Sequence, residues 1–258
     1  MLTSYECWPA MNANPPIVLN PDGRLPGVIA VDHAGRSVPP GLGELGLAPA
    51  WRDSHYFCDL GVAELAHELA ARIDVPIVLC DVSRLVIDVN RWVDDPRSIA
   101  TALEGTPIPA NAALPPAERE ARQEAVFWPY HNLLGAIWER QTARHPRPFF
   151  FALHSCTRVF DGQHRPWDGG TLWHDDDTLS RHLLDHLGKE DGLVLGDNQP
   201  YSGRNGVFTV DWHSYGSGLP ACGFEVTNDL LETGRDRARW ASRLAGALTA
   251  AIDDGVAA

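Results

Sequence analysis

Short apolar runs that end on polar residues recur along the chain, and two of them lead into a histidine. Val28–Val31 is too short for a helix, and its β-branched residues favour a buried strand. It is followed by Asp32 and His33. Phe149–Leu153 has the same design and is followed by His154. Open α/β sheets carry their ligand sites at the carboxyl ends of strands, so the two histidines can converge there in the fold.

The remaining pattern alternates strands with helices. Strands are predicted at 75–80, 85–89, 193–196 and 221–226, and helices at about 54–72, 117–142, 178–187 and 236–252. The segment 117–142 is expected to be one long helix or a pair interrupted near Pro129. This alternation predicts a mostly parallel α/β sheet.

Turn-forming residues mark two long loops and the start of the chain. Residues 92–116 are expected to form a surface excursion, and 197–218 a loop of the kind found at active sites. Residues 1–16 are expected to be an irregular lead-in, and 17–258 a single domain.

Composition narrows the class of protein. The 258 residues are 44% hydrophobic and 21% charged, as expected for one large folded domain. The formal charge of −13 argues against binding nucleic acid or anionic membranes, because both need a basic surface. No apolar run reaches the roughly 18 residues that span a bilayer, and Met1–Asn14 shows no signal-peptide pattern. Five cysteines without a C-x-x-C pair favour a reducing cytoplasm over a disulfide framework.

His33, Asp59 and His154 are candidate ligands of a catalytic metal. A catalytic zinc takes about three protein ligands, usually histidine and carboxylate, and keeps one position open for water. Each residue alone also fits a plainer role, because strand-end histidines are often simply hydrogen-bonded and Asp59 is suited to a helix start. His55, four residues before Asp59, could share a helical face with it and is a rival ligand.

Glu225 is the candidate general base. It lies within the apolar run 221–226, where an unpaired carboxylate is costly to bury. It is therefore either paired with an arginine or functional, taking a proton from water and passing it to a leaving amine. Arg84, Asn90 and Arg91 follow apolar runs and could bind an acidic substrate, since arginine holds carboxylates through two parallel hydrogen bonds. Surface ion pairing is the alternative.

Nine short motifs, in order from about residue 17 to 245, resemble those of the N-formylglutamate amidohydrolases. They read Asp32-His-Ala-Gly, Asp59-Leu-Gly-Val, Ser83-Arg-Leu-Val-Ile-Asp-Val-Asn-Arg91, Thr106-Pro-Ile-Pro-Ala-Asn111, Pro129-Tyr-His131, His154-Ser-Cys-Thr157, Arg165-Pro-Trp167, Gly196-Asp-Asn-Gln-Pro-Tyr201 and Glu225-Val-Thr-Asn-Asp-Leu230. The chain departs from the family pattern at Gly35 (usually serine), Cys156 (usually phenylalanine) and Thr227 (usually arginine). The missing arginine bears on the substrate side chain more than on the zinc chemistry.

The resemblance implies a fold and a metal site. The fold would be a three-layer αβα, phosphorylase/hydrolase-like arrangement with a mixed, mainly parallel eight-stranded sheet, similar to the zinc carboxypeptidases and aspartoacylase. One zinc per chain would be held by His33, a carboxylate and His154. In carboxypeptidases that carboxylate follows the first histidine by three residues, where this chain has Arg36. Asp59 takes its place by likeness to related zinc amidases.

The resemblance also implies an activity. Glu225 would be the general base, Arg84 would polarise the scissile carbonyl, and Asn90 and Arg91 would hold the substrate carboxylate. Further candidate substrate contacts are His131, His213 and Tyr201, and the two histidines could instead support neighbours of the site. The expected reaction is hydrolysis of an N-acyl, foremost N-formyl, amino acid such as N-formyl-L-glutamate, a step of histidine degradation. Alternatives are a deacylase or carboxypeptidase-like hydrolase, or a catalytically silent carboxylate-binding relative; a monomer or small homo-oligomer is expected.

Overall fold

A mixed seven-stranded sheet forms the centre of the computed structural model, which describes residues 11–205 and 208–258. Its strands, in spatial order, are β1 (Ile17–Leu19), β3 (Ile77–Leu79), β2 (Gly27–Val31), β6 (Phe149–Cys156), β11 (Ala221–Thr227), β9 (Gly169–Leu172) and β10 (Leu195–Asp197). The pairs β1–β3 and β9–β11 are antiparallel, and the other neighbours are parallel. The mainly parallel α/β sheet is confirmed, with seven strands in the described part of the chain where eight were expected.

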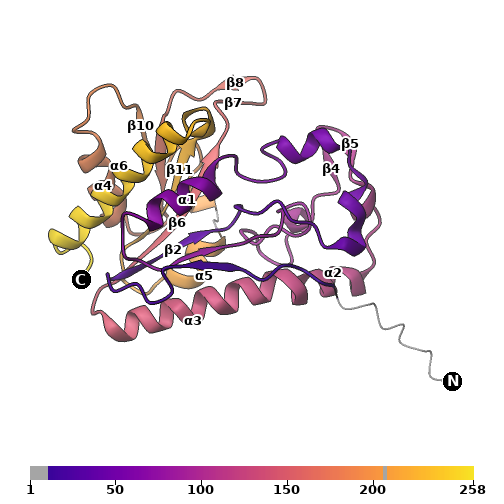
Figure 1. Cartoon of the computed structure of the whole chain (residues 1–258), viewed down its shortest axis with the longest axis horizontal. Helices are drawn as coiled ribbons and strands as arrows, with labels where there is room; N and C mark the ends of the chain where they lie inside the picture. Colours follow the sequence, from indigo (N-terminus) through magenta and orange to yellow (C-terminus); the bar gives the residue numbers. More distant parts are fainter. Residues whose placement is uncertain (1–10, 206–207) are drawn as a thin grey trace.

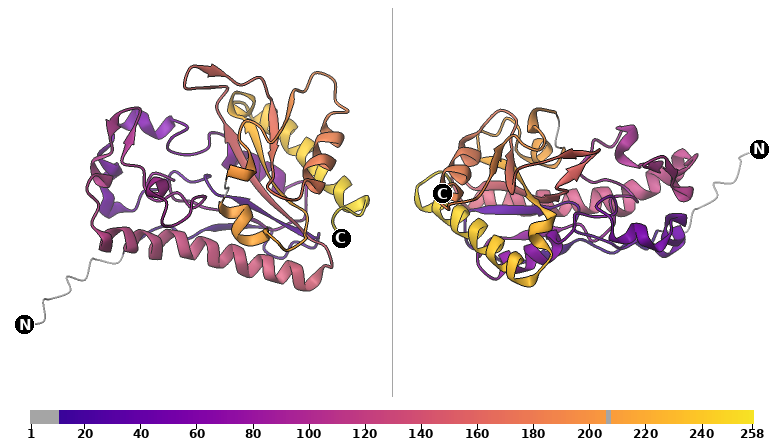
Figure 2. Two further views of the ribbon diagram at one scale, coloured as in Figure 1. Left: turned by 180° about the vertical axis from the view of Figure 1, so that it is seen from behind. Right: turned by 90° about the horizontal axis from the view of Figure 1, so that it is seen from above.

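Helices cover both faces of this sheet. They are α1 (Val62–Ala70), α2 (Pro116–Arg122), α3 (Trp128–Arg144), α4 (Thr178–Leu187), α5 (Phe208–Ser214) and α6 (Gly234–Asp253). Helices α1, α4 and α6 lie on one face and the long α3 runs along the other, as Figures 1 and 2 show. Ile29 and Val31 of β2 pack on the face covered by α1, α4 and α6. Val28 and Ala30 pack on the opposite face, which α3 covers. Burial on both faces explains why the strands read as continuous apolar runs.

The apolar run 85–89 is not a strand, contrary to the prediction. Its backbone turns, and the Ser83 hydroxyl accepts a hydrogen bond from the Leu85 N–H while donating to the Phe57 carbonyl. Such side-chain to backbone bonds compete with a strand ladder. The run is apolar because it packs into the core layer beneath α3. It therefore does not add the expected eighth strand.

The helix predicted over about 54–72 begins only at Val62. Gly61, with φ of +79°, precedes the helix in the left-handed conformation. Asp59 therefore lies before the helix, and its carbonyl accepts the Val62 N–H. His55 and Asp59 do not share a helical face, so the reason given for His55 as an alternative metal ligand is wrong.

The predicted helix over 117–142 continues through a π-helical turn, η5 (Gln123–Phe127), which joins α2 to α3. Pro129 lies at the start of α3, directly after this turn, so the π-helical turn stands where the proline removes a backbone N–H donor. The interruption predicted near this proline is thus a change of helical pitch rather than a break.

Shorter elements fill the loops. Short 3₁₀ turns are η1 (Pro40–Gly46), η2 (Pro49–Asp53), η3 (Pro96–Ser98), η4 (Pro109–Asn111), η6 (Gly203–Asn205) and η7 (Asn228–Leu231), and two small hairpins are β4–β5 (Ala102–Leu103, Thr106–Pro107) and β7–β8 (Val159–Phe160, Gln163–His164). The loop predicted over 197–218 contains α5. Residues 11–16 have no regular structure, and the rest of the predicted lead-in lies outside the described residues.

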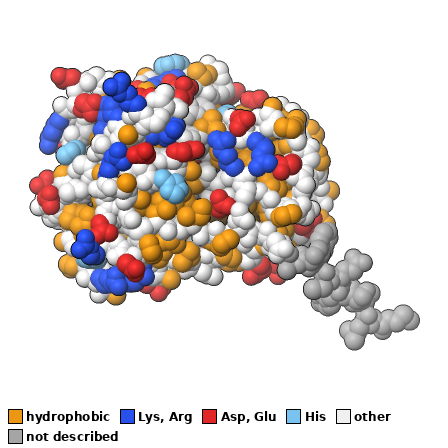
Figure 3. Space-filling model, viewed as in Figure 1, with side chains coloured by type: hydrophobic (Ala, Val, Ile, Leu, Met, Phe, Trp, Pro, Cys, Tyr) orange, Lys and Arg blue, Asp and Glu red, His pale blue; other side chains and the backbone are white. Residues whose placement is uncertain are grey.

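Two surface properties bear on partners. Acidic and basic side chains are interspersed over the face drawn in Figure 3. Among the described helices, none combines the length and apolar character required to span a membrane.

Candidate active site

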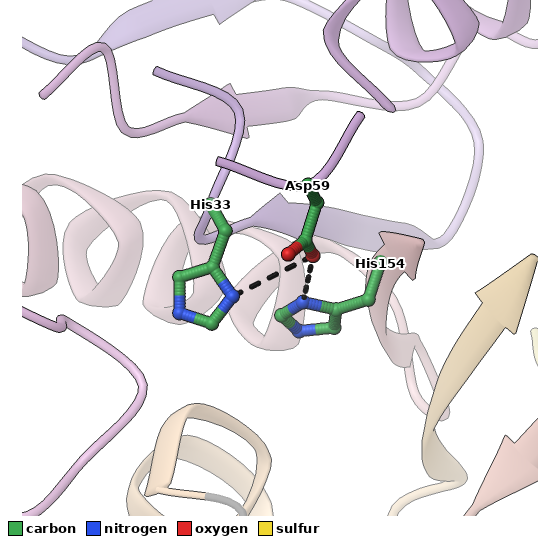
Figure 4. A group of neighbouring side chains, drawn as sticks. All are labelled: His33, Asp59 and His154. Carbon is green, nitrogen blue, oxygen red and sulfur yellow. Dashed lines mark hydrogen bonds and ion pairs between the residues drawn. The ribbon is translucent and has the colours of Figure 1, made fainter. Parts of the chain in front are cut away.

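Three buried side chains meet at the carboxyl end of the sheet. His33 follows β2, His154 lies in the neighbouring parallel strand β6, and the Asp59 N–H donates to the His33 carbonyl at 2.9 Å. Both imidazoles turn a Nδ1 atom toward Asp59 Oδ2, at 3.5 Å for His33 and 2.9 Å for His154 (Figure 4). One candidate ligand atom from each residue lies within 4.8 Å of the others.

A second carboxylate holds the far nitrogen of each imidazole. His33 Nε2 lies 2.7 Å from Asp88 Oδ1, and His154 Nε2 lies 3.2 Å from Asp32 Oδ2. Burial opposes the charged form of His154, but the carboxylates of Asp32 and Asp59 outweigh it and raise its pKa well above the ordinary value. Burial also opposes the charged form of His33, but the carboxylates of Asp88 and Asp59 outweigh it and raise the pKa of this imidazole.

This arrangement fits a divalent metal such as zinc. Two imidazoles and one carboxylate are the donor set of catalytic zinc sites. Metal-ligating histidines characteristically give their other nitrogen to a carboxylate, which fixes the ring and its tautomer. Both histidines turn a nitrogen toward the buried Asp59 carboxylate. His33, Asp59 and His154 are therefore the residues suited to hold the ion.

His55 lies outside this group. Its half-buried ring packs against the tilted ring of Tyr56, with 3.9 Å between the ring centroids, and it lines the cleft above the three buried side chains. Of the two rival ligands, the structure brings Asp59 and not His55 to the two histidines.

Glu225 faces the same centre from β11. It pairs with His154 across the parallel β6–β11 ladder. Its Oε2 atom is buried and has no hydrogen-bond partner among the described residues. Burial, together with the nearby Asp59 charge and against the opposing charge of His154, raises the pKa of Glu225 to about 7. A carboxyl group with this pKa can both take and give a proton near neutral pH.

Arg84 and Arg91 converge on Asp88 at one side of the centre. Arg84 donates to Asp88 Oδ2 at 2.7 Å and to Asp59 Oδ1 at 3.4 Å, and Arg91 Nε lies 3.3 Å from Asp88 Oδ2. The Asn90 amide lies 3.4 Å from His154 Nε2. The arginine side chains are 25% and 33% exposed, so their remaining N–H groups can reach a ligand.

These groups open into a cleft of about 800 Å³. Glu225, Arg84, Asn90, Arg91 and Tyr201 line it, together with the three candidate metal ligands.

His131 and His213 are not among the lining residues. Their rings lie 3.2 Å apart, measured from His131 Nδ1 to His213 Nε2, and His131 Nε2 contacts the Val89 carbonyl at 2.8 Å. Their position beneath the Asn90 segment suits support of neighbouring residues, the other role foreseen for them, rather than contact with a substrate.

Asp32 and Asp88 are site residues to which the sequence pattern assigned no role. The Asp32 Oδ1 atom accepts hydrogen bonds from Tyr130 at 2.7 Å and Thr209 at 2.9 Å, so its carboxylate is rigidly held. A signal existed for Asp88, because it interrupts an apolar run just as Glu225 does.

The backbone after His33 is pressed against the end of β3. The Ser37 N–H donates to the Asp81 carbonyl at 3.0 Å. A Cβ atom at Gly35 would lie only 1.9 Å from the carbonyl carbon of Asp81, so no side chain fits there. This contact fixes the segment that presents His33.

Comparison with known proteins identifies the family of the chain. The sequence model of the N-formylglutamate amidohydrolases matches residues 25–232. No curated protein matches the chain. A gene product of Agrobacterium tumefaciens with a crystal structure is 29% identical, with a TM-score of 0.87 over 93% of this chain and 96% of that one. The N-formylglutamate amidohydrolase of Ralstonia eutropha is 19% identical and shares the fold, with a TM-score of 0.65 over 90% of this chain and 95% of that one. Since the family match covers most of its length, the chain belongs to the N-formylglutamate amidohydrolase family of amide hydrolases.

Proposed function

We propose that this amidohydrolase is metal-dependent and removes the N-formyl group of an acidic amino acid, foremost N-formyl-L-glutamate, releasing formate and the free amino acid. One observation carries the proposal. The buried group of His33, Asp59 and His154 lies beside a glutamate that has no hydrogen-bond partner on its buried Oε2 atom among the described residues. A zinc ion held by that group would supply Lewis acidity at the amide carbonyl and lower the pKa of water.

Glu225 moves the proton. Its carboxylate takes a proton from water as the water oxygen adds to the amide carbonyl carbon. It then gives that proton to the amide nitrogen as the C–N bond breaks, so the amine leaves neutral. A pKa of about 7 suits both transfers, because the group is neither too weak a base nor too weak an acid.

Arg84 and Arg91 bind the negative charges of the substrate and of the reacting amide. Arg84 lies beside the candidate ligand Asp59 and presents N–H groups to the oxygen that becomes negative, a role that contributes about 3–4 kcal/mol in other enzymes. Asn90 and Arg91 orient the substrate through its α-carboxylate.

A deacylase acting on a larger N-acyl amino acid is the second candidate. The cleft volume of about 800 Å³ favours it, because pockets for drug-sized ligands span about 300–1,000 Å³ and a formyl amino acid is smaller than such ligands. A cytoplasmic location and a place in histidine degradation stay predictions.

Metal analysis combined with an acyl panel tests the proposal. Purified protein is expected to hold close to one zinc per chain, and a His154→Ala variant to lose it. Release of free glutamate, the product common to all of them, is then measured with N-formyl, N-acetyl and longer N-acyl derivatives of glutamate. Preference for the formyl group supports the first candidate and preference for longer groups the second. A protein that takes up no metal and cleaves none of them contradicts both.

A further inference from the structure

Arg165 is an arginine at the edge of the cleft without an acidic partner among the described residues. It lies between β8 and β9, and its guanidinium donates to the Tyr201 hydroxyl at 2.8 Å and to the Thr157 carbonyl at 3.3 Å. The chain has 34 acidic and 21 basic residues, and arginines elsewhere in the described part of the site pair with carboxylates. Two of the five N–H groups of Arg165 are used, which leaves a charged donor available to a ligand.

Two aromatic rings fix the direction of this guanidinium. Its central carbon lies 4.8 Å from the ring centroid of Phe160 and 4.7 Å from that of Tyr201. Both rings line the cleft. Stacking on aromatic faces holds an arginine fork in place, so less conformational entropy is lost when it binds a carboxylate.

Arg165 lies across the centre from the other arginines. Arg84 and Arg91 follow β3, on one side of the metal group, whereas Arg165 precedes β9 on the other side. His154 and Glu225 lie on the strands between. Arg165 lines a narrow recess that shares Cys156, Pro200 and Glu225 with the main cleft, so Arg165 and the proposed general base line the same recess.

We propose that Arg165 binds the side-chain carboxylate of an N-acyl dicarboxylic amino acid, while Asn90 and Arg91 hold its α-carboxylate. The two cationic positions then lie on opposite sides of the amide to be cleaved. This assignment rests on the proposed function and adds the residue that would recognise the acidic side chain.

A pair of substrates that differ in one charge tests the assignment. N-formyl-L-glutamine has the shape of N-formyl-L-glutamate but lacks the side-chain charge. In an Arg165→Gln variant, kcat/KM for the glutamate substrate is expected to fall about 10- to 100-fold, the usual value of a charged hydrogen bond, and kcat/KM for the glutamine substrate to change little. The matched control is Arg204→Gln, since Arg204 also stacks on a ring, that of Trp173, and has no acidic partner among the described residues. It should leave the ratio of the two kcat/KM values unchanged.

A binding measurement separates this assignment from the proposed activity. N-formyl-L-glutamate and N-formyl-L-glutamine are each titrated calorimetrically into Glu225→Gln protein with and without Arg165→Gln or the milder Arg165→Lys. Loss of affinity for the glutamate ligand alone supports the assignment, whatever the turnover. Equal loss for both ligands, or no loss, overturns it. Wild-type protein that binds the dicarboxylate through Arg165 but releases no formate would contradict the proposed function and leave the assignment standing.

Discussion

Glu225 and His154 lie directly opposite each other on the parallel strands β11 and β6. Side chains at paired positions project from the same face of a sheet, so the proposed base and a proposed metal ligand are held side by side by backbone hydrogen bonds. The proposed metal ligand and the proposed base thus lie on adjacent strands, and variants can separate metal binding from proton transfer.

A Glu225→Gln variant should keep its metal and lose its activity. The amide cannot take the proton, and general-base catalysis contributes typically 10²–10⁴-fold, so kcat should fall by about that factor. Glu104→Gln is the matched control, because Glu104 also lines the cleft but accepts the Tyr56 hydroxyl at 2.9 Å. Metal content and formate release are measured together. Glu225→Gln protein with full metal and full turnover would show that another group moves the proton.

Metal affinity should distinguish Asp59 from His55. The Asp59 oxygen lies between both histidines, so Asp59→Asn is expected to weaken zinc binding by more than the roughly 10–100-fold that loss of an outer partner costs. His55→Ala should bind zinc as tightly as the wild type, because its ring lies with Tyr56 in the cleft wall. Competition with a chromophoric chelator gives both dissociation constants. The reverse order of effects would make His55 the ligand.

Asp32 is expected to act on the metal through His154. Asp32→Asn keeps the shape and the hydrogen bonds from Tyr130 and Thr209, but it removes the charge beside the imidazole. Zinc affinity should fall about 10- to 100-fold. Asp95→Asn, at a surface carboxylate bound to Arg97, serves as the control and should leave affinity unchanged. An unaltered dissociation constant in Asp32→Asn would assign Asp32 to folding alone.

The His131–His213 pair should make stability depend on pH. The Val89 carbonyl accepts from His131 Nε2–H, so His131 Nδ1 can accept from His213 Nε2–H while the His131 ring is neutral. Burial, and then the neighbouring His131, lower the pKa of His213 to about 4. The neutral form is favoured in the folded state, so this stabilisation is complete above the ordinary histidine pKa and is lost as the pH falls from about 6.5 toward 4. The loss is on the order of 3 kcal/mol.

Chemical denaturation at several pH values measures this effect. A His213→Gln variant keeps a donor to His131 but does not titrate, so its free energy of unfolding should decline less steeply between pH 6.5 and 4. His164→Gln, at an exposed position of β8, should keep the wild-type dependence. Equal slopes for wild type and His213→Gln would mean that the pair does not govern acid stability.

The sequence predicted the central strands well and the irregular core poorly. Val28–Val31 and Phe149–Leu153 are strands because residues buried on both faces must be apolar throughout. The run 85–89 is equally apolar but turns, since the bonds of Ser83 override its strand propensity. Apolar content reports burial, and the path of the backbone depends on partners that are distant in sequence.

The residues of the candidate site likewise differ in how far the sequence could predict them. His33, His154 and Glu225 could be found because strand ends and buried charges leave a pattern. Asp59 reaches them through a backbone bond to the His33 carbonyl, which no residue type encodes, so its place among the candidate ligands rested on its carboxylate and its family motif. The burial of His131 away from the cleft depends on the packing of α3 and had no signal in the sequence.

Gly35 has a consequence for how this chain can change. Any side chain at residue 35 would overlap the backbone of Asp81. A serine at this position can therefore be accommodated only after the segment at Asp81 has moved. In evolutionary terms the two positions are coupled, and the order in which mutations arrive at them decides which intermediates still present His33 correctly.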